Sequence, residues 1–533
     1  MPSDLRDCGH VGLSNNFALG ARHPCYGLPL AALFLPSARR RMHPLQRLND
    51  NNQSQVPHSV GRGCYPRDVA PKIVHLGVGA FHRAHQAWYF HQLNKLQADA
   101  PWMIVGASLR SPTASDQLNP QQGWYSHHAQ SATDVSHELV GSIHSVIDAR
   151  SEPRRLRDLI AAPSTQLVTL TITEKGYCYD PATGELAKSD AAVQADLASL
   201  EHPVTALGHL LAGLMQRYRA GHKGVTVLSC DNLSHNGNIT KRMVLTLAQH
   251  HDPALAHWID THVAFPNAMV DRIAPAMSSA KFDEVTAILG FRDDGAVVTE
   301  AFSQWVIEDT FAAERPALEK VGVTWVADVA PWEQRKLRLL NAAHSGLACL
   351  GSWFGLEHVH EAVSGELLGG LCDALWREIL PTLPIDNDFD AEAYCRALKQ
   401  RFANPHLQHA LLQIATDSSQ KLPQRILAPL SERLERGEQV STLTHVVAAW
   451  MCIQGGVSQS DQPLRFTDPL QPALARQLEA APHCYQARAS LIIEAYPPLQ
   501  GLVTRFPAWR NELEYCYRSL HSRSDLSIGD SSS

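Results

Sequence analysis

The feature that most constrains the fold is a short apolar run at residues 73–76, which ends directly at the turn Gly77-Val78-Gly79-Ala80-Phe81-His82. Residues 83–96 then carry apolar side chains at helical spacing. A strand, a glycine turn and a helix in this order are typical of a dinucleotide-binding unit, because the first glycine permits the tight turn and the second lets a pyrophosphate approach the backbone. His82 occupies the third glycine position of that pattern, so a purely structural turn remains the alternative.

Further short apolar runs lie at residues 103–107, 166–172 and 225–229, each bounded by polar turns. Amphipathic stretches such as residues 204–220 separate them. Strands that alternate with helices indicate a parallel sheet covered on both faces. The sequence therefore predicts the α/β class, with a Rossmann-type N-terminal domain over residues 72–325.

The pattern changes after about residue 326, where helical periodicity dominates and few strand candidates remain. The expected helices span residues 336–350, 367–380, 391–402 and 443–453. We predict a mostly α-helical C-terminal domain over residues 326–521, followed by a serine-rich, disordered tail at residues 522–533.

The first 71 residues are predicted to be a disordered extension and linker. Residues 49–71 are rich in Asn, Gln, Ser, Pro and Gly, a composition typical of a linker. Met42 directly follows three arginines and lies well before the first predicted fold element, so it is a candidate for the true start of the protein.

Composition excludes several classes of function. The formal net charge is -7, which provides no basic field for nucleic acid. No uninterrupted apolar run is long enough to span a membrane. Eleven cysteines without a CxxC pair indicate reduced thiols and a cytoplasmic location. The expected partner is therefore a small molecule rather than nucleic acid or a membrane; a monomer and a dimer both stay open.

Candidate catalytic residues follow a buried strand and occupy one helix. Asn232 comes directly after the strand at 225–229, where ligands bind in parallel sheets, although an Asx turn or helix cap is the alternative. On an α-helix, Glu333, Lys336, Asn341 and His344 share one half of the surface, among leucines. A polar stripe at a domain edge is the alternative to a catalytic face.

These residue types suit hydride chemistry on a secondary alcohol. Lys336 is predicted to act as general base in alcohol oxidation and general acid in ketone reduction, provided that burial or a second cation lowers its pKa. Asn232 and Asn341 would stabilise the developing alkoxide with neutral hydrogen bonds. His344 would orient a substrate hydroxyl.

The cofactor preference stays open. An acidic residue usually ends the second strand of an NAD site, but here that strand leads to Arg110, and the first acid is Asp116. Arg110 and nearby hydroxyls could instead receive a 2'-phosphate, so NAD is expected and NADP is not excluded. No metal is expected, since His127-His128 and the pair His358 and His360 lack companion ligands at metal spacing.

Several stretches together resemble the long-chain mannitol dehydrogenase and fructuronate reductase family. They are residues 73–87 (IVHLGVGAFHRAHQA), 171–178 (TITEKGYC), 229–237 (SCDNLSHNG), 265–273 (FPNAMVDRI), 304–309 (QWVIED) and 336–344 (KLRLLNAAH). The resemblance implies a Rossmann-type domain, a helical domain and metal-free catalysis between them. It implies that Lys336 is the catalytic acid and base, that Asn232 and Asn341 polarise the substrate oxygen, and that His344 contacts the substrate.

The resemblance adds further site residues. It implies that Asp271 lines the substrate site and that Glu333 assists proton passage beside the lysine. The cofactor contacts expected on this basis and from the glycine turn are Gly77, Val78, Gly79, Ala80, Phe81, Arg110 and Glu174.

Substrate choice within this family depends on where a cation meets a carboxylate. Polyol-oxidising members tend to have glycine at the position of Lys175 and lack the run that contains Lys421 and Arg425, whereas uronate-reducing members resemble this chain at both places. Reduction of D-fructuronate to D-mannonate is therefore the leading hypothesis. Ala342-Ala343 and Ser418 depart from the Gly-Ser and Gly expected of the uronate-reducing members, and Asn267 is similar to the polyol members. Mannitol 2-dehydrogenase and D-arabinitol 4-dehydrogenase therefore stay alternatives. A catalytically silent dinucleotide-binding sensor is a further alternative.

Overall fold

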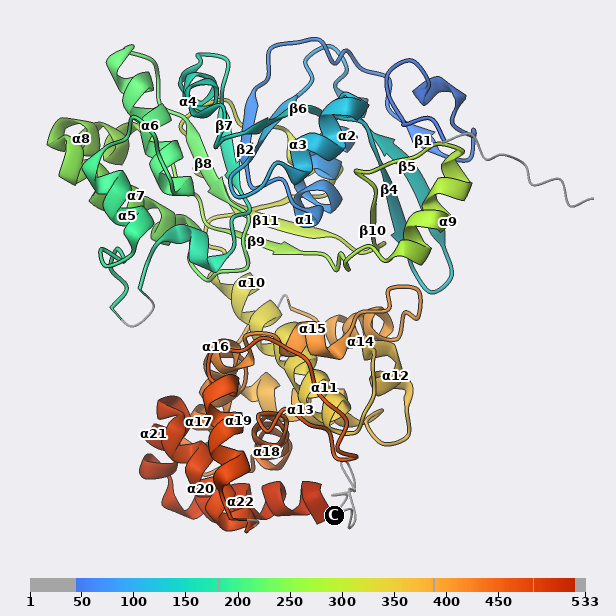
Figure 1. Cartoon of the computed structure of the whole chain (residues 1–533), viewed down its shortest axis with the longest axis vertical. Helices are drawn as coiled ribbons and strands as arrows, with labels where there is room; N and C mark the ends of the chain where they lie inside the picture. Colours follow the sequence, from blue (N-terminus) through green and yellow to red (C-terminus); the bar gives the residue numbers. More distant parts are fainter. Residues whose placement is uncertain (1–44, 181–182, 387–388, 483, 523–533) are drawn as a thin grey trace, which may run out of the picture. The chain divides into compact units, whose positions relative to one another are not determined.

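The computed structural model describes residues 45–180, 183–386, 389–482 and 484–522. The predicted extension before residue 45, the alternative start at Met42 and the predicted tail from residue 523 lie outside the described residues. Within the described ranges an α/β part precedes a part built of helices, as the sequence predicts (Figure 1).

A parallel sheet of five strands forms the centre of the α/β part, in the order β6-β3-β2-β7-β8. Successive residues of β2 point to opposite faces: Val74 packs in one core and Ile73 in the other. The helices α4, α6, α7 and α8 cover the first face, and α2 covers the second. The predicted sheet with two covered faces is confirmed. The bounds are β2 (Ile73–Leu76), β3 (Ile104–Ser108), β6 (Ile143–Asp148), β7 (Leu167–Leu170), β8 (Thr226–Ser229), α2 (Gln86–Leu96), α4 (Pro153–Ala161), α6 (Ala206–Arg219), α7 (Asn236–His251) and α8 (Pro253–His262).

Two smaller sheets, which the sequence did not predict, complete this part. One has the order β1-β5-β4-β10 and the other the order β12-β11-β9. The strand β9 ends at Asp271 and β10 ends at Glu300, and these two carboxylates recur in the site below. The bounds are β1 (Gly61–Arg62), β4 (Tyr125–Gln130), β5 (Val135–Val140), β9 (Ala268–Asp271), β10 (Val297–Glu300), β11 (Gln304–Glu308) and β12 (Thr324–Val326).

The segment at residues 45–71 is structured, in contrast to the linker that its composition predicts. Its strand β1 pairs in parallel with β5. Leu48, Val56 and Val60 are almost fully buried and pack with Trp124 in a small core. The apolar residues of this segment are too widely spaced to produce a periodic signal, yet they are enough to bury it.

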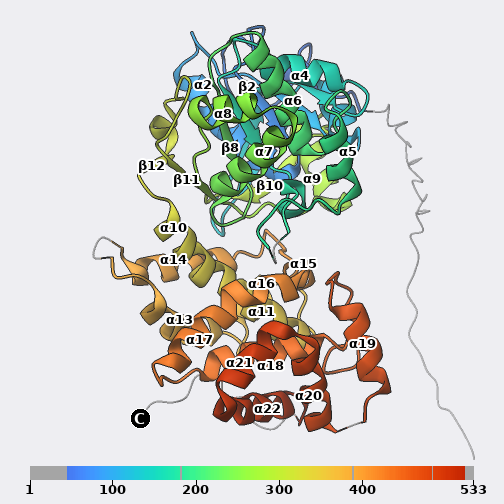
Figure 2. The same ribbon diagram turned by 90° about the vertical axis from the view of Figure 1, so that its left-hand side faces the viewer.

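The C-terminal part consists of helices packed around α11 and α18 (Figure 2). Eleven consecutive or near-consecutive side chains of α18 are buried, so this helix is apolar on all sides, as expected of a central helix. Among the described residues, no helix combines the length and apolar composition needed to cross a membrane. The principal bounds are α10 (Ala330–Arg335), η5 (Lys336–Asn341), α11 (Ala342–Trp353), α13 (Leu371–Ile379), α14 (Ala391–Phe402), α16 (Ser418–Leu422), η7 (Pro423–Leu427), α17 (Ala428–Glu435), α18 (Ser441–Ile453), α20 (Tyr485–Ala495), α21 (Pro497–Arg505) and α22 (Pro507–Ser522).

The remaining helices are short or peripheral. They are α1 (Ala80–Ala84), α3 (Thr113–Leu118), α5 (Ala191–Ala198), α9 (Ser279–Leu289), α12 (Val359–Ser364), α15 (Leu411–Ala415) and α19 (Gln471–Ala480). Of these, α1 and α3 position the site, because α1 begins at the glycine turn and α3 begins after the end of β3.

Candidate active site

The glycine turn after β2 has the backbone geometry that a dinucleotide requires. Gly77 has a φ of 98°, and a Cβ there would lie 2.1 Å from the carbonyl oxygen of Thr171, so only glycine fits. A Cβ on Gly79 would meet nothing nearer than the Gly77 oxygen at 4.0 Å. The backbone at Gly79 therefore borders open space, which a pyrophosphate can enter.

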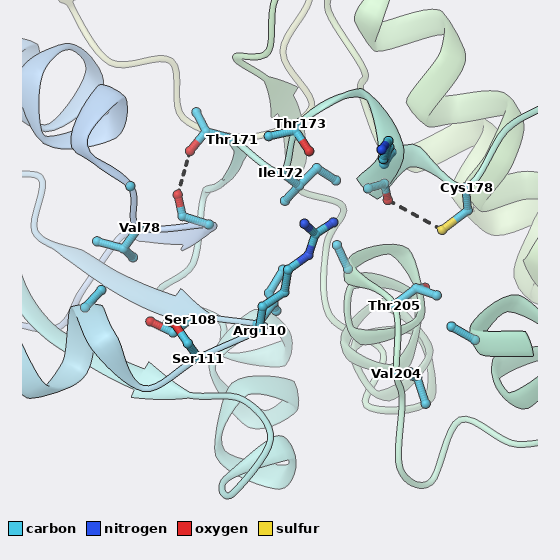
Figure 3. A pocket seen from close by; sticks show the side chains of 18 of the residues that line it. Val78, Ser108, Arg110, Ser111, Thr171, Ile172, Thr173, Cys178, Val204 and Thr205 are labelled. Carbon is cyan, nitrogen blue, oxygen red and sulfur yellow. Dashed lines mark hydrogen bonds between the residues drawn. The ribbon is translucent and has the colours of Figure 1, made fainter. Parts of the chain in front are cut away.

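That space is a cavity of about 810 Å³ between the turn, the end of β3 and the start of α6. Figure 3 shows Val78, Ser108, Arg110 and Thr171 around it, with the Thr171 hydroxyl donating a hydrogen bond of 2.6 Å to the Gly77 oxygen. The size, the glycine turn and the cationic lining fit a nicotinamide dinucleotide. Of the expected cofactor residues, Gly77, Val78, Gly79, Ala80 and Arg110 line the cavity. Phe81 and Glu174 do not.

Lys336 is held from two sides by hydrogen bonds. Its Nζ donates to Oδ1 of Asn232 at 2.6 Å and to the carbonyl oxygen of Val270 at 2.7 Å. Asn232 follows β8, and Val270 belongs to β9, so two different sheets position the amine. Lys336 and Asn232, which are 104 residues apart in the chain, are thus in direct contact, as the sequence analysis predicted for two groups of one site.

The pKa of Lys336 is lowered from 10.5 to about 8. Burial is the largest cause, since only 8% of the residue is exposed. The charges of Arg425 and Arg401 add to the lowering, whereas Asp271 and Glu333 oppose it. The amine therefore exchanges a proton near neutral pH, which is the property required of a general acid and base.

Lys336 and Asn341 are the two ends of a π-helical segment, η5, inserted between α10 and α11. The sequence predicts that these polar residues lie on a regular α-helix. That prediction is wrong for residues 336–341, which form the wider turn of a π-helix. Such insertions are common at functional sites because they re-aim side chains within a helix. A second π-helical segment, η7, carries Arg425 and packs against η5.

Asn341 and His344 are both largely buried beside Lys336 in the chain. Nε2 of His344 is buried without a hydrogen-bond partner among the described residues. His344 packs against Phe402 and His409, with ring centroids 4.6 and 5.4 Å away. Burial, assisted by His409 and nearby cations, keeps the pKa of His344 well below its usual value, so the ring is neutral and can make one more hydrogen bond.

Asp271 is tied to Arg401, a residue that the sequence analysis did not single out. The Arg401 guanidinium on α14 donates to both carboxylate oxygens of Asp271, at 2.8 and 3.0 Å, and to both oxygens of Glu300, each at 2.8 Å. All three side chains are at least nine-tenths buried. Burial is the largest single influence on Asp271 and opposes its ionisation, but the charge and hydrogen bonds of Arg401, together with the charge of Lys336, lower the pKa of that carboxyl. No local sequence signal distinguishes Arg401, because its partners lie 130 and 101 residues away.

Glu333 lies one helical turn before Lys336 and accepts hydrogen bonds from the backbone N–H of His235 at 3.2 and 3.3 Å. Burial raises the pKa of its carboxyl. It also lines a small cavity of about 270 Å³ together with His235 and Gln424. A carboxyl of raised pKa beside such a cavity can relay a proton.

Arg425 and Lys421 are cations without a carboxylate at ion-pair distance in the described part of the chain. Nη1 of Arg425 donates only to the Ser345 hydroxyl, at 3.3 Å, and burial lowers the pKa of the guanidinium to about 10. Lys421 donates to the carbonyl oxygen of Thr416, and burial and Arg425 lower its pKa. Arg425 acts electrostatically on Lys336 and on His344, which places its charge near both.

Lys175 and Glu174, neighbours on the short helix η3 (Glu174–Tyr177), do not stand where the sequence analysis expected them. Lys175, expected at the substrate, is exposed and lines the dinucleotide cavity. Glu174, expected at the cofactor, is exposed and acts electrostatically on Arg425 and Lys421. In the described ranges, no group of three or more His, Cys, Asp or Glu side chains has the arrangement of a metal site.

Comparison with protein families matches residues 71–320 to the mannitol dehydrogenase Rossmann domain and residues 328–492 to the mannitol dehydrogenase C-terminal domain. A D-mannonate oxidoreductase of Escherichia coli (strain K12) is 40% identical over 404 residues, which are 75% of this chain and 83% of that protein. A mannitol 2-dehydrogenase of Aspergillus fumigatus is 38% identical over 453 residues, covering 82% of this chain and 90% of that protein.

Two solved structures have the same fold over nearly the whole chain. Pseudomonas fluorescens mannitol 2-dehydrogenase, in a ternary complex with NAD and D-mannitol, has a TM-score of 0.81 at 34% identity and covers 90% of this chain and 97% of its own. A D-sorbitol dehydrogenase in substrate-free form has a TM-score of 0.79 at 30% identity and covers 90% and 99%.

Proposed function

The chain belongs to the mannitol dehydrogenase family, and we propose that it reduces D-fructuronate to D-mannonate, with NAD(P)H as the hydride donor. As a member of this family it is an NAD(P)-dependent oxidoreductase that interconverts a secondary alcohol and a ketone. Relatives named for a sugar acid and for neutral polyols are about equally similar, so the substrate is decided by the site.

The observation that carries the proposal is the unpaired guanidinium of Arg425. A buried arginine without an anionic partner is costly, and a substrate carboxylate would compensate it with two parallel hydrogen bonds. In the described structure the guanidinium has one neutral contact, the Ser345 hydroxyl, and only 9% of the residue is exposed. A neutral polyol would leave this charge unpaired, whereas the carboxylate of a uronate would pair it.

The proton and the oxygen of the substrate are assigned to the residues around Lys336. Bound reduced nicotinamide supplies the hydride to the carbonyl carbon. Lys336 then gives its proton to the carbonyl oxygen, which yields the secondary alcohol, and Glu333 returns a proton from solvent. Because Oδ1 of Asn232 is occupied by Lys336, the Nδ2 hydrogens of Asn232 face away from the lysine and can bind the developing alkoxide together with the Asn341 amide.

Asn267, which is similar to the polyol members, and Ser418, which replaces the expected glycine, carry little weight once their contacts are considered. The Asn267 side chain binds the Glu308 carboxylate at 3.1 Å and accepts from the backbone of Asn238. The Ser418 hydroxyl donates to Asp468 and accepts from Trp450. Both side chains are occupied by structural hydrogen bonds, so neither is available to select a sugar.

The test compares D-fructuronate, D-tagaturonate, D-fructose and D-xylulose as substrates of the wild type and of Arg425→Met. We expect the wild type to have the highest kcat/KM for D-fructuronate. Charged hydrogen bonds contribute about 1.5–3 kcal/mol, so the variant should lose about 10- to 150-fold in kcat/KM for uronates and little for neutral ketoses.

Arg425→Lys is the matched control, because it keeps the charge and loses the bidentate geometry. We expect it to retain an intermediate kcat/KM for uronates. A wild type that prefers D-fructose or D-xylulose, or an Arg425→Met variant that loses activity equally on all four ketoses, would contradict the proposal and favour a polyol dehydrogenase.

A further inference from the structure

The end of β3 is the part of the dinucleotide cavity that faces the adenosine side of the cofactor in folds of this kind. In this chain the strand ends at Ser108 and leads through Leu109 to Arg110 and Ser111, all of which line the cavity. Figure 3 shows the Arg110 side chain projecting into the middle of the cavity, with Ser108 and Ser111 beside it.

The charge of this region is positive. The cationic lining residues are Arg83, Arg110 and Lys175. Among the described residues of the lining, the one carboxylate is Asp190, and it caps α5 by accepting hydrogen bonds from the N–H groups of Ala192 and Val193. No acid is therefore available, within the described lining, to accept hydrogen bonds from the two hydroxyls of an NAD ribose.

The two acidic residues nearest to the end of β3 in the sheet and in the sequence, Asp148 and Asp116, are also unavailable to the ribose. Asp148 lies opposite Ser108 in the register of β6 and β3, but its carboxylate accepts hydrogen bonds from the Arg150 guanidinium at 3.1 and 3.0 Å. Asp116 is exposed on α3 and does not line the cavity.

Three lining side chains, those of Arg110, Ser108 and Thr113, each have a donor that no described residue accepts. Arg110 is exposed and lines the cavity, and its guanidinium forms no hydrogen bond or ion pair with any described residue. The Ser108 hydroxyl belongs to a residue that is only 7% exposed, lines the same cavity and has no partner among the described groups. The Ser111 hydroxyl already donates to Thr113 at 3.0 Å, which leaves the Thr113 hydroxyl free to donate.

We infer that these groups form a subsite for the 2'-phosphate of NADP(H), so that the protein binds NADP(H) more tightly than NAD(H). A planar guanidinium with adjacent hydroxyls matches the oxygens of a phosphate, and the charge-assisted hydrogen bonds are stronger than those to a ribose hydroxyl. The inference rests on the proposed function only in that the cavity holds a nicotinamide dinucleotide; it does not depend on which sugar is reduced.

The experiment measures binding without substrate. The protein is titrated by calorimetry with NADPH and NADH, and with 2',5'-ADP and 5'-AMP, a second matched pair that lacks the nicotinamide. We expect NADPH and 2',5'-ADP to bind about tenfold or more tightly than their counterparts without the 2'-phosphate. Arg110→Gln should remove most of this advantage and change the NADH and 5'-AMP affinities less than about threefold, which also shows that the variant is folded.

Arg154→Gln is the matched control, because Arg154 is exposed on α4 and lies outside the cavity lining. It should change all four affinities less than about twofold, which separates a direct contact from a general loss of charge. The inference is overturned if the wild type binds NADH as tightly as NADPH, or if Arg110→Gln weakens both equally. Failure of D-fructuronate as a substrate would leave these titrations unaffected, so the two proposals can fail separately.

Discussion

Replacing Arg401 with glutamine removes the cation that Asp271 and Glu300 share. The two carboxylates are 5% and 2% exposed and receive four hydrogen bonds of 2.8–3.0 Å from the guanidinium. Removing one partner of a buried ion pair costs about 3–5 kcal/mol, because the other charge stays buried without compensation. We expect Arg401→Gln to lower the free energy of unfolding by about this amount at pH 8.

The same helix provides the matched control. Arg396 on α14 pairs with Glu392 four residues earlier, but the two side chains are 65% and 87% exposed. An exposed pair at this spacing contributes about 0.3–0.5 kcal/mol, so Arg396→Gln should reduce the free energy of unfolding by no more than that. Denaturant titrations of both variants and the wild type, analysed with a common slope, measure the difference.

The effect of Arg401→Gln should also depend on pH. In the wild type the pKa of Asp271 is lowered, so its contribution to stability is present above the unfolded pKa and is lost as the pH falls through the folded value. Burial already raises the pKa of Glu300 in the wild type, against the charge of Arg401. In the variant, loss of that cation should raise the pKa of both Asp271 and Glu300 further, so that acid protonates both. The difference from the wild type should therefore shrink between pH 8 and pH 5. A loss at pH 8 no larger than that of Arg396→Gln would refute the assignment of a buried, stabilising ion triad.

Three further predictions concern catalysis and the cofactor. Lys336→Ala should reduce kcat by about 10²–10⁴-fold and leave the dissociation constant of the dinucleotide nearly unchanged, because the amine is assigned to proton transfer and does not line the dinucleotide cavity. Equal losses in kcat and in dinucleotide affinity would contradict this role. Because the pKa of Lys336 is lowered to about 8, the rate of alcohol oxidation should rise, and that of ketone reduction should fall, as the pH increases through about 8. The same apparent pKa in both pH profiles would indicate that one group acts as base in oxidation and as acid in reduction. Gly77→Ala should abolish dinucleotide binding in a titration, because its Cβ would clash with the Thr171 oxygen. Gly322→Ala, where φ is 94° but a Cβ would meet nothing within 4 Å, should only reduce stability slightly.

The sequence predicted the parts of the fold whose signal is local. The runs before Gly77 and around residues 104, 167 and 226 are apolar on both sides, so they show as buried strands of the central sheet. The strands β4 and β5 (YSHHAQ and VSHELV) are rich in polar residues, and the sequence analysis missed them. In the structure His128 of β4 bonds His137 of β5, so the polarity is satisfied across the sheet, a pairing that no local pattern indicates.

The candidate site was predicted in part for the same reason. Lys336, Asn341 and His344 occur within nine residues, and the contact between Lys336 and Asn232 follows from placing both at the ends of their elements. The π-helical turn was not predictable, because an i to i+5 hydrogen bond leaves no periodic signature in six residues. Arg401 was missed because only the tertiary fold distinguishes it from Arg396 on the same helix.

The charges around Lys336 connect substrate recognition to proton transfer. Arg401 is compensated by two carboxylates, and burial keeps His344 neutral. Arg425 is therefore the cation near Lys336 that has no carboxylate at ion-pair distance within the described residues, although the charge of Glu174 reaches it. Its charge is one of the causes that lower the pKa of Lys336. A carboxylate bound at Arg425 would cancel this effect and keep Lys336 protonated, in the form that a ketone reduction consumes. A neutral ketose would leave Arg425 without an ion pair and a smaller fraction of Lys336 protonated. Under the proposed function, the arginine that would bind the uronate would therefore also favour its reduction.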